Sequence, residues 1–494
     1  MTRSFQNAIW VSLCALALRV PVARAQQEQQ PQQPIQQEPS TQSSGPIPAY
    51  RSPLASAADN GDDADNDSQQ VAPDTRSLSG AQYLSLGIPT AHSYWQPHFD
   101  VSATADSNAL ETANSAGWGA WTSVTAGVDV RRTSGNNDMT LSYKSGGMFS
   151  NYTGISNGIV QGLTFKDQLA FRRSSLSFFD NLNYLPESSF GFGGLGGNAT
   201  LGSTSFGLGS AFTPGQSLLT GYGQNLENSF ATELDTYLTP RTSLTFVGGY
   251  SLLHYFDSDL LDFGDFTFRG GYNYQVTRKD TLAVLYTFSG FRYSNFDQSI
   301  DDHTVWVSYG RRVTGRLAFQ VAAGPQLVIS RVPIRGNAES ASSGSGVGTN
   351  STQILWSLNT AVQWQPNRTA LNLAYNHGVS GGSGVLAGSI SDVVTGSAAR
   401  QVSRTFSDAL TVGYSRNQGL ATTGSAPSSQ TYDYWFAGAS LTHPMGRALG
   451  LTFSYQMQYQ TSNSTFCVGP TCGSDVIRNV ISVGVGWHER PLLF

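Results

Sequence analysis

Two histidines that stand among aspartates come nearest, in this sequence, to acid–base chemistry. They are His254 with Asp257, Asp259 and Asp262, and His303 with Asp301 and Asp302. A histidine beside a carboxylate can accept and return a proton near neutral pH. The same aspartates can instead bind calcium, bridge to lipid headgroups through cations, or be solvated. No G-x-S-x-G turn, H-E-x-x-H pair or phosphate-binding loop accompanies them, so the sequence predicts neither an enzyme nor a cofactor.

Two cysteines near the C-terminus, Cys467 and Cys472, frame the segment CVGPTC. In an exported chain such a pair predicts a local disulfide that pins a loop. A metal site is the weaker interpretation, because no second cysteine pair or nearby histidine completes a ligand set. We therefore predict a disulfide and no metal.

The first 25 residues are typical of an export signal. Arg3 supplies a positive start, Ala8–Leu18 an apolar core, and Ala23–Ala25 a small-residue cleavage site. Residues 26–94 are rich in Gln, Pro and Asp, and they contain too few apolar side chains to fold. The predicted division is a signal peptide at 1–25, a disordered periplasmic segment at 26–94 that could bind a periplasmic partner, and one folded domain at 95–494.

Charged residues are scarce in this chain. They make up 12% of it, against about 25% in ordinary globular domains. A soluble β-sandwich places Lys and Glu on its wet face, whereas here that face carries Ser, Thr, Asn, Gln and Gly. The formal net charge of −5 leaves no basic surplus to neutralise phosphates, so no nucleic-acid partner is predicted.

The elements that must position any functional residue are β-strands. In the segment ALGLTFSYQMQYQ, residues 448–460, apolar residues alternate strictly with small or polar ones that are never charged. A period of two places the two sets on opposite faces of a strand. The apolar set is Leu449, Leu451, Phe453, Tyr455, Met457 and Tyr459.

Short and long connections alternate along the domain. The short ones are Ser134–Asn137, Arg173–Ser174, Thr239–Pro240, Arg278–Lys279, Thr314–Gly315, Pro366–Asn367, Ser403–Arg404 and Pro444–Arg447; the long ones include Ser107–Ala120, Leu185–Leu226, Val332–Asn350, Asn417–Gln430 and Thr461–Asp475. Eight short turns imply nine hairpins, hence about 18 antiparallel strands, with 16 as the alternative. This pattern predicts an all-β fold, a transmembrane antiparallel up-and-down β-barrel with short periplasmic turns and long extracellular loops. A soluble sandwich or propeller is the alternative, but it would need charged outer faces.

The signal peptide, the hairpin rhythm and the ending VGVGWHERPLLF resemble bacterial outer-membrane β-barrels of the porin type. The TPRTSL hairpins also resemble putative β-barrel porins linked to exopolysaccharide export. This resemblance implies a Gram-negative outer membrane, contact with its lipid and lipopolysaccharide, and recognition of the terminal Phe494 by the barrel-assembly machinery. The tail departs from the usual form, because His488 and Arg490 share the parity of Phe494 and Pro491 interrupts the strand. The oligomeric state is not indicated.

Parity along the strands predicts which charges face the lumen. The candidates are Asp129, Arg131, Lys144, Lys166 and Arg172 on the second to fourth strands, Glu233 and Asp235 on the sixth, and Arg269 on the eighth. A basic wall beside an acidic one would select permeants by charge and dipole. The alternative is that these charges pair with one another or lie at the rims.

The loop Leu185–Leu226 corresponds in place to the loop that folds inward in general porins. Its constriction candidates are Phe190, Phe192, Leu195, Phe206 and Leu208; the alternative is a flexible external loop. A porin-like channel for passive diffusion or export of small hydrophilic or oligosaccharide-like solutes is the function that the sequence predicts. A non-conducting adhesin or structural barrel is the alternative, and a barrel-embedded hydrolase is disfavoured because no nucleophile can be identified. A TonB-dependent receptor would need a folded plug, and residues 26–94 are too short and polar for one.

Overall fold

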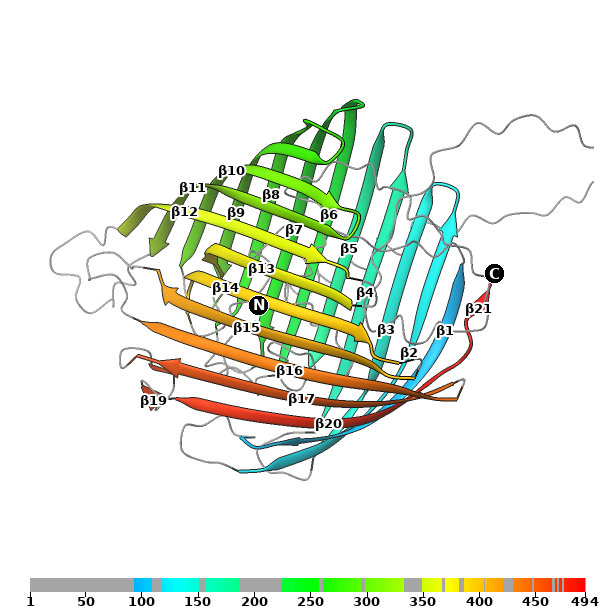
Figure 1. The fold of residues 1–494 in the computed structure, drawn as a ribbon. Coiled ribbons are helices and arrows are strands. Elements are labelled where there is room, and N and C mark those ends of the chain that lie inside the picture. The colour runs from blue at the N-terminus through cyan, green and yellow to red at the C-terminus, as the bar shows by residue number, and fades with distance from the viewer. Residues whose placement is uncertain are drawn as a thin grey trace, which may run out of the picture. The chain divides into compact units, whose positions relative to one another are not determined.

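A computed structural model gives the fold of the chain (Figure 1). It describes residues 93–108, 117–150, 157–185, 224–256, 261–294, 298–332, 349–366, 369–381, 386–403, 405–420, 430–446, 448–463, 467–468, 471–472 and 475–493. Among these residues no helix could span a membrane. The predicted signal peptide and almost all of the predicted periplasmic segment lie outside them.

Eighteen long strands make up the described part of the chain. They are β1 (Tyr94–Asp106), β2 (Gly119–Ser134), β3 (Asn137–Ser150), β4 (Gly158–Ala170), β5 (Ser174–Leu185), β6 (Asn225–Thr239), β7 (Thr242–Tyr255), β8 (Phe263–Gln275), β9 (Asp280–Tyr293), β10 (Ser299–Thr314), β11 (Leu317–Val332), β12 (Thr349–Trp364), β13 (Thr369–Ser380), β14 (Ser389–Gln401), β15 (Ser407–Gly419), β16 (Thr431–Met445), β17 (Leu449–Ser462) and β20 (Val476–His488). Three short pieces accompany them: β18 (Cys467–Val468), β19 (Thr471–Cys472) and β21 (Leu492–Leu493).

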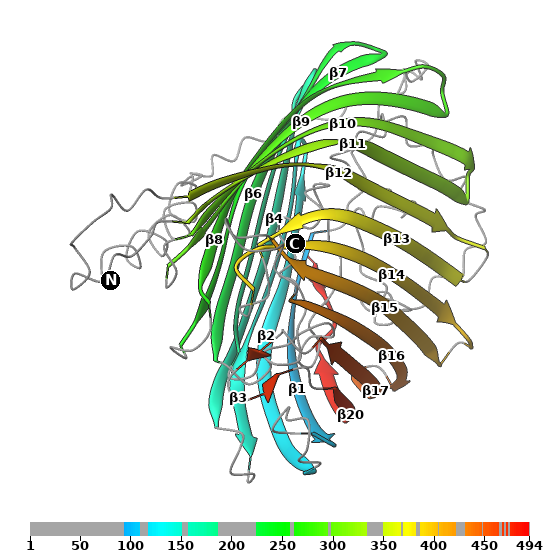
Figure 2. The same ribbon diagram turned by 90° about the vertical axis from the view of Figure 1, so that its left-hand side faces the viewer.

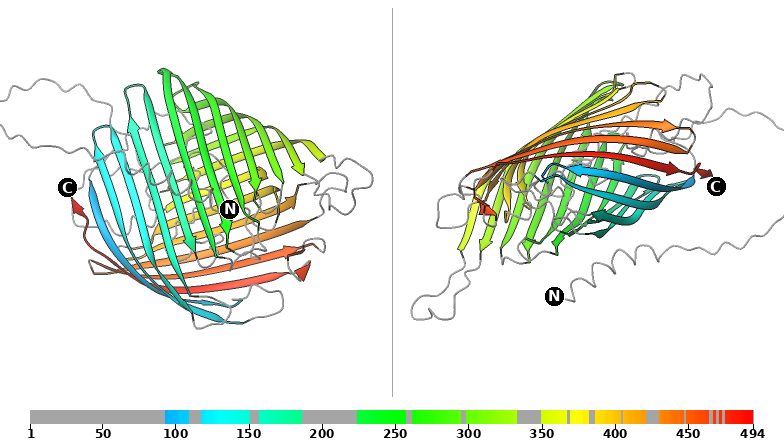
Figure 3. Two further views of the ribbon diagram at one scale, coloured as in Figure 1. Left: turned by 180° about the vertical axis from the view of Figure 1, so that it is seen from behind. Right: turned by 90° about the horizontal axis from the view of Figure 1, so that it is seen from below.

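The long strands form one closed antiparallel sheet. Each pairs with its neighbours in chain order, and β1 pairs with both β2 and β20, which closes the barrel (Figure 3). The predicted barrel of 18 strands is confirmed. The eight predicted short connections all fall between consecutive strands at one end, which we call the turn end. The long connections lie at the other, which we call the loop end.

The two faces of the wall differ as the alternation predicts. In β17, Leu449, Phe453 and Tyr455 are exposed, whereas Gln458 and Gln460 are buried. Directly opposed residues on neighbouring strands lie on the same face, so the register extends this assignment around the barrel. The outer face is therefore apolar and the inner face polar. Hydrocarbon can meet such an outer wall, and the pairing of β1 with β20 leaves neither the first nor the last long strand as a sheet edge.

A β-bulge interrupts the last strand. His98 pairs with His488 and Trp95 pairs with Leu492, so β1 advances three residues where the last strand advances four. The extra residue lies at Glu489–Pro491, where Glu489 N–H donates to the Pro97 carbonyl. It breaks the parity of the tail, so Leu492 is 44% exposed although His488, of the same parity, lies on the inner face. Phe494 lies outside the described residues.

Candidate functional site

The inner face of the barrel gathers most of the predicted lumen charges. Lys144 of β3 is the register partner of Gly127, which lies on the inner face of β2. Lys166 of β4 is the register partner of Thr140, which in turn lies opposite Arg131 of β2. Both lysines therefore lie on the inner face of the barrel. Glu233 pairs with Val247, which pairs with Arg269, and all three are buried. The inner positions are Asp129 and Arg131 on β2, Lys144 on β3, Lys166 on β4, Glu233 and Asp235 on β6, and Arg269 on β8.

Arg172 does not lie on a strand as predicted. Strand β4 ends at Ala170, and the Phe171 N–H donates to the Ser174 carbonyl over 2.7 Å, which closes the turn. Arg172 is one of the two central residues of that turn, with Arg173, and it is exposed at the turn end. Its position corresponds to the alternative in which some charges lie at the rim.

An acidic area covers the inner face of β6 to β10. Asp235 accepts a hydrogen bond from the Thr245 hydroxyl, and Arg269 Nε donates to Thr287 Oγ1 over 3.0 Å. Buried Asp265 accepts from Thr267 over 3.0 Å, and buried Asp302 accepts from Thr304 over 3.3 Å. Neither Asp265 nor Asp302 was predicted to line the pore, yet both share the parity of inner neighbours on their strands.

The inner face of β1 to β4 is mixed rather than basic. Arg131 Nη2 donates to Asp138 Oδ2 over 3.1 Å. His98 Nδ1 lies 3.5 Å from Asp129 Oδ2, and the His98 and His488 rings stack with centroids 5.7 Å apart. Among the predicted basic residues on this side, Arg131 therefore has a carboxylate beside it.

A buried ion pair joins the first strand to the last, between two residues that the sequence did not predict as lumen charges. Arg478 Nε donates to Asp106 Oδ2 over 2.6 Å, and both side chains are buried on the inner face. Asn108 Nδ2 donates to the Ile477 carbonyl over 3.1 Å, and the Ser107 N–H donates to the Asn479 carbonyl over 2.9 Å. These bonds hold the loop end of the seam between β1 and β20.

Apolar side chains meet inside the barrel at the loop end. This mouth cluster consists of Leu253, Tyr255, Phe291, Tyr293, Ile300, Val328, Val379 and Leu420, all buried, with Leu355, Ala387 and Ile390 packed against it. It narrows the described part of the lumen on the side of β7 to β14. The predicted constriction residues Phe190, Phe192, Leu195, Phe206 and Leu208 lie outside the described residues.

In the two predicted histidine–aspartate segments, His254, His303 and Asp301 lie on the outer face at the loop end, Asp302 lies on the inner face, and Asp257 and Asp259 lie outside the described residues. His254 Nδ1 is 2.6 Å from Asp262 Oδ2, while His303 Nδ1 is 2.8 Å from the Tyr286 hydroxyl. Asp301 accepts from Arg292 over 2.6 Å and from Arg331 over 2.5 Å, also on the outer face. His254, His303 and Asp301 therefore face away from the lumen.

The two cysteines lie opposite each other in a small ribbon. Cys467 of β18 and Cys472 of β19 are register partners. Opposed residues of an antiparallel pair have Cα atoms about 4.5–5.5 Å apart, a separation that a disulfide can bridge. The disulfide itself stays a prediction. No cluster of metal-binding side chains occurs among the described residues.

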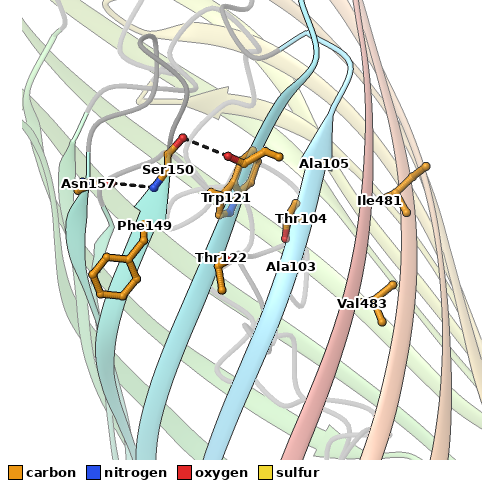
Figure 4. Close-up of a pocket in the computed structure, with 11 residues that line it drawn as sticks. Ala103, Thr104, Ala105, Trp121, Thr122, Phe149, Ser150, Asn157, Ile481 and Val483 are labelled. Carbon is orange, nitrogen blue, oxygen red and sulfur yellow. Dashed lines mark hydrogen bonds between the residues drawn. The ribbon is translucent and has the colours of Figure 1, made fainter.

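A shallow pocket lies on the outer face of the barrel near the seam between β1 and β20 (Figure 4). Small residues such as Ala103 and Ala105 form its floor, and Phe149 and Ile481 flank it. At its loop end the Ser150 hydroxyl donates to the Ala120 carbonyl over 3.2 Å. The mostly apolar lining fits contact with lipid chains rather than with a polar solute.

No family model and no curated protein matches this chain. Similar solved structures include OccAB3 of Acinetobacter baumannii, with 9% identity, a TM-score of 0.39, and 80% of this chain and 99% of that chain covered. OccK2 (OpdF) of Pseudomonas aeruginosa, in complex with glucuronate, gives 9% identity, a TM-score of 0.38, and 80% and 98% coverage. The outer membrane protein OpdK of the same organism gives 10% identity, a TM-score of 0.37, and 80% and 99% coverage. At these TM-scores the likeness adds nothing to what the strand order shows.

Proposed function

We propose that this chain is an outer-membrane channel for passive diffusion of small hydrophilic solutes. The observation that carries the proposal is the opposite chemistry of the two faces of one closed wall. The outer face is predominantly apolar from β1 to β20, although it also carries charged residues such as Asp301 and Arg331, whereas the inner face carries Ser, Thr, Asn, Gln and charged residues. A barrel of 16 to 18 strands encloses enough space for an aqueous channel. The opposed faces support a barrel that separates lipid from a polar interior.

We further propose that the channel prefers cations. Carboxylates outnumber basic groups on the described inner face: Asp100, Asp106, Asp129, Asp138, Glu227, Glu233, Asp235, Asp265 and Asp302 stand against Arg131, Lys144, Lys166, Arg269, Arg312 and Arg478. A wall with an excess of one charge raises the local concentration of the opposite ion. The mouth cluster favours small permeants over oligosaccharides, because it narrows the lumen at the loop end.

Single-channel recording in a planar bilayer tests both statements. The refolded chain without its signal peptide should give discrete conductance steps, and a salt gradient should give a reversal potential of the sign for cation selectivity. Asp100→Asn with Asp129→Asn, which removes two inner-face carboxylates whose side chains are 43% and 38% exposed, should reduce that selectivity. The matched control is Asp301→Asn, which removes a carboxylate from the outer face and should leave the reversal potential unchanged.

A barrel that folds but never conducts would overturn the proposal. Folding is checked by heat-modifiable migration on a gel. That outcome would favour the non-conducting adhesin or structural barrel. A conducting barrel that selects anions would retain the channel and refute the cation preference.

A further inference from the structure

The barrel wall splits between β12 and β13. Their pairing runs from Trp364–Leu371 to Leu358–His377 and goes no further. Strand β12 continues to Thr349 and pairs with β11 along its whole length. Along Thr349–Ser357 the other edge of β12 has no strand partner among the described residues, and the separation of the two strands can be followed in Figure 2. As far as the described residues go, the loop half of β12 is therefore an open sheet edge.

The end of the β13–β14 hairpin lies inside the barrel at this split. The Tyr293 hydroxyl donates to the Gly381 carbonyl over 2.6 Å, and Gln298 Nε2 donates to the Ala387 carbonyl over 3.1 Å. Gly388 has a φ of 81°, and a Cβ there would lie 2.2 Å from Ile300 Cδ1. Only glycine fits this combination of positive φ and close approach. The hairpin end is thus packed against inner side chains of β9 and β10.

Nearer the turn end, one face of the β13–β14 hairpin lies on the outside of the barrel. At the split, the same face packs against residues of the interior. Val379 has the parity of Leu373 and Tyr375 on the outer face, yet it is buried in the mouth cluster with Ile300 and Val328. Ile390, its register partner on β14, also packs against that cluster. The inward displacement of the hairpin therefore brings apolar side chains to the inner side of the split.

Apolar side chains lie on both faces of β12 at the split and reach the mouth cluster inside; we call this set, Ile354, Leu355, Val379 and Ile390, the apolar path. On β12, Ile354 is 80% exposed on the outer face, and the next residue, Leu355, packs against the mouth cluster inside. The Trp356 ring stacks on His377 with centroids 3.9 Å apart, and His377 Nδ1 lies 2.7 Å from Asp392 Oδ1. These contacts fix the lower margin of the split, where the pairing begins.

The strand behind the split, β11, has a local irregularity at the same level. Gly324 and Pro325 of β11 pair with Ser357 and Trp356 of β12, at the level where the split begins. On the opposite side of β11, its pairing with β10 is interrupted at the same residues. Thr304 pairs with Gln326 and Val307 pairs with Ala323, and no register pair lies between these two. Proline has no N–H to donate, so it interrupts such a ladder. This second interruption at the same level is independent of the β12–β13 separation.

Hydrocarbon cannot satisfy an open sheet edge, so its occupant must offer hydrogen-bonding groups. The path beside that edge is lined by Ile354, Leu355, Val379 and Ile390, which favours an apolar chain. We propose that the split is a lateral portal that admits an amphipathic molecule, with one apolar chain and a hydrogen-bonding head, between the membrane and the mouth cluster. Its head group bonds to the free edge of β12, and its chain lies against the mouth cluster. This activity is separate from diffusion of polar solutes along the lumen.

A photoreactive probe tests the portal. The full barrel, refolded in lipid vesicles, is irradiated with a 12-carbon fatty acid that carries a diazirine, and the labelled residues are mapped by mass spectrometry. Residues on the outer face, such as Val362, should be labelled both at the portal and below it. Inner residues should be labelled at the portal, at Leu355, and not below it, at Ala361 on the inner face of the same strand.

Two variants separate entry through the portal from general lipid contact. Ile390→Glu places a charge in the apolar path and should reduce labelling of Leu355 about tenfold while leaving Val362 unchanged. A second variant closes the split with a disulfide between Leu355→Cys and Ser380→Cys, in a chain in which Cys467 and Cys472 are replaced by Ser. These two positions would lie opposite each other if the register of β12 and β13 continued. When this disulfide is oxidised, the probe should no longer label Ile390. The matched control disulfide joins Ala361→Cys to Ala374→Cys, which already pair below the split.

Equal labelling of Leu355 and Ala361 would overturn the proposal. So would unchanged labelling of Leu355 in an Ile390→Glu variant whose heat-modifiable migration shows a folded barrel. Neither result depends on conductance, so the channel and the portal can fail separately.

Discussion

Replacement of Asp106 by Asn is expected to weaken the barrel at the seam between its first and last strands. The Arg478 and Asp106 side chains are 6% and 0% exposed and lie 2.6 Å apart, Nε to Oδ2. Removal of one partner of a buried ion pair leaves an uncompensated charge, at a cost of about 3–5 kcal/mol. Asn keeps the size of Asp and an oxygen for the Asn108 N–H, so the lost charge is the main change. The equilibrium constant for unfolding should rise by about two to four powers of ten.

Urea unfolding of the barrel in lipid vesicles, followed by tryptophan fluorescence, measures this change. The matched control is Arg331→Met, which also removes a guanidinium from an aspartate. Arg331 contacts Asp301 over 2.5 Å, but its side chain is 47% exposed and Arg292 stays in place. Asp301 keeps Arg292 as a partner at 2.6 Å, so the control leaves no unpaired charge and should unfold nearly as the unmodified barrel does.

The double variant Asp106→Asn/Arg478→Gln tests the cause of the loss. If the penalty comes from an unpaired buried charge, removal of both charges should restore part of the stability lost in Asp106→Asn. A loss below about 1 kcal/mol in the single variant would refute the reasoning. A double variant that is less stable than Asp106→Asn would refute it too, because a charge penalty predicts recovery.

Three further outcomes follow from the wall itself. Val284 lies on the outer face of β9 and is 54% exposed, so Val284→Arg should lower the free energy of unfolding by about 2–4 kcal/mol. Val313→Arg, near the turn end, should lower it by about 0–1 kcal/mol. Equal losses would contradict the membrane position of β9. Gly127→Ala should destabilise the barrel by about 1–3 kcal/mol, because its Cβ would lie 2.4 Å from both His98 Nε2 and the Tyr143 carbonyl oxygen. Gly248→Ala, whose Cβ would meet only Thr232 Cγ2 at 3.9 Å, is its control. Cys467 and Cys472 should resist alkylation in oxidised membranes until a reductant is added, and two reactive thiols there would refute the disulfide.

Features that repeat locally could be predicted from the sequence. Alternation over ten residues defines two faces, and a tight turn needs only a few residues, so the strands, the turns and most inner charges follow from short windows. Asp265 and Asp302 were within reach of the same parity argument. Arg172 was misplaced because a shift of two residues at a strand end moves a side chain from the wall to the turn.

Features that depend on pairing between distant segments could not be predicted. Arg478 has inner parity on its strand, but nothing local indicates that Asp106 lies beside it, because barrel closure alone brings them together. The bulge at Glu489–Pro491 requires the register of β1 with the last strand on both sides. Val379 shows the limit of parity most clearly, since it alternates as an outer residue and is nevertheless buried inside.

The two irregular seams of the barrel are built differently, and the difference bears on what the split does. At the seam of β1 with β20, side chains add to the backbone pairing near the loop end: Asp106 holds Arg478, and Asn108 bonds the Ile477 carbonyl. Between β12 and β13, the described loop half offers instead an open edge, an exposed Ile354, and apolar Leu355 behind it. A seam that merely closes the barrel needs hydrogen bonds, because every unpaired backbone group in hydrocarbon is costly. An edge left open beside an apolar path is therefore stabilised only when something amphipathic occupies it, which is why a transported or bound molecule accounts for the split better than imperfect closure does.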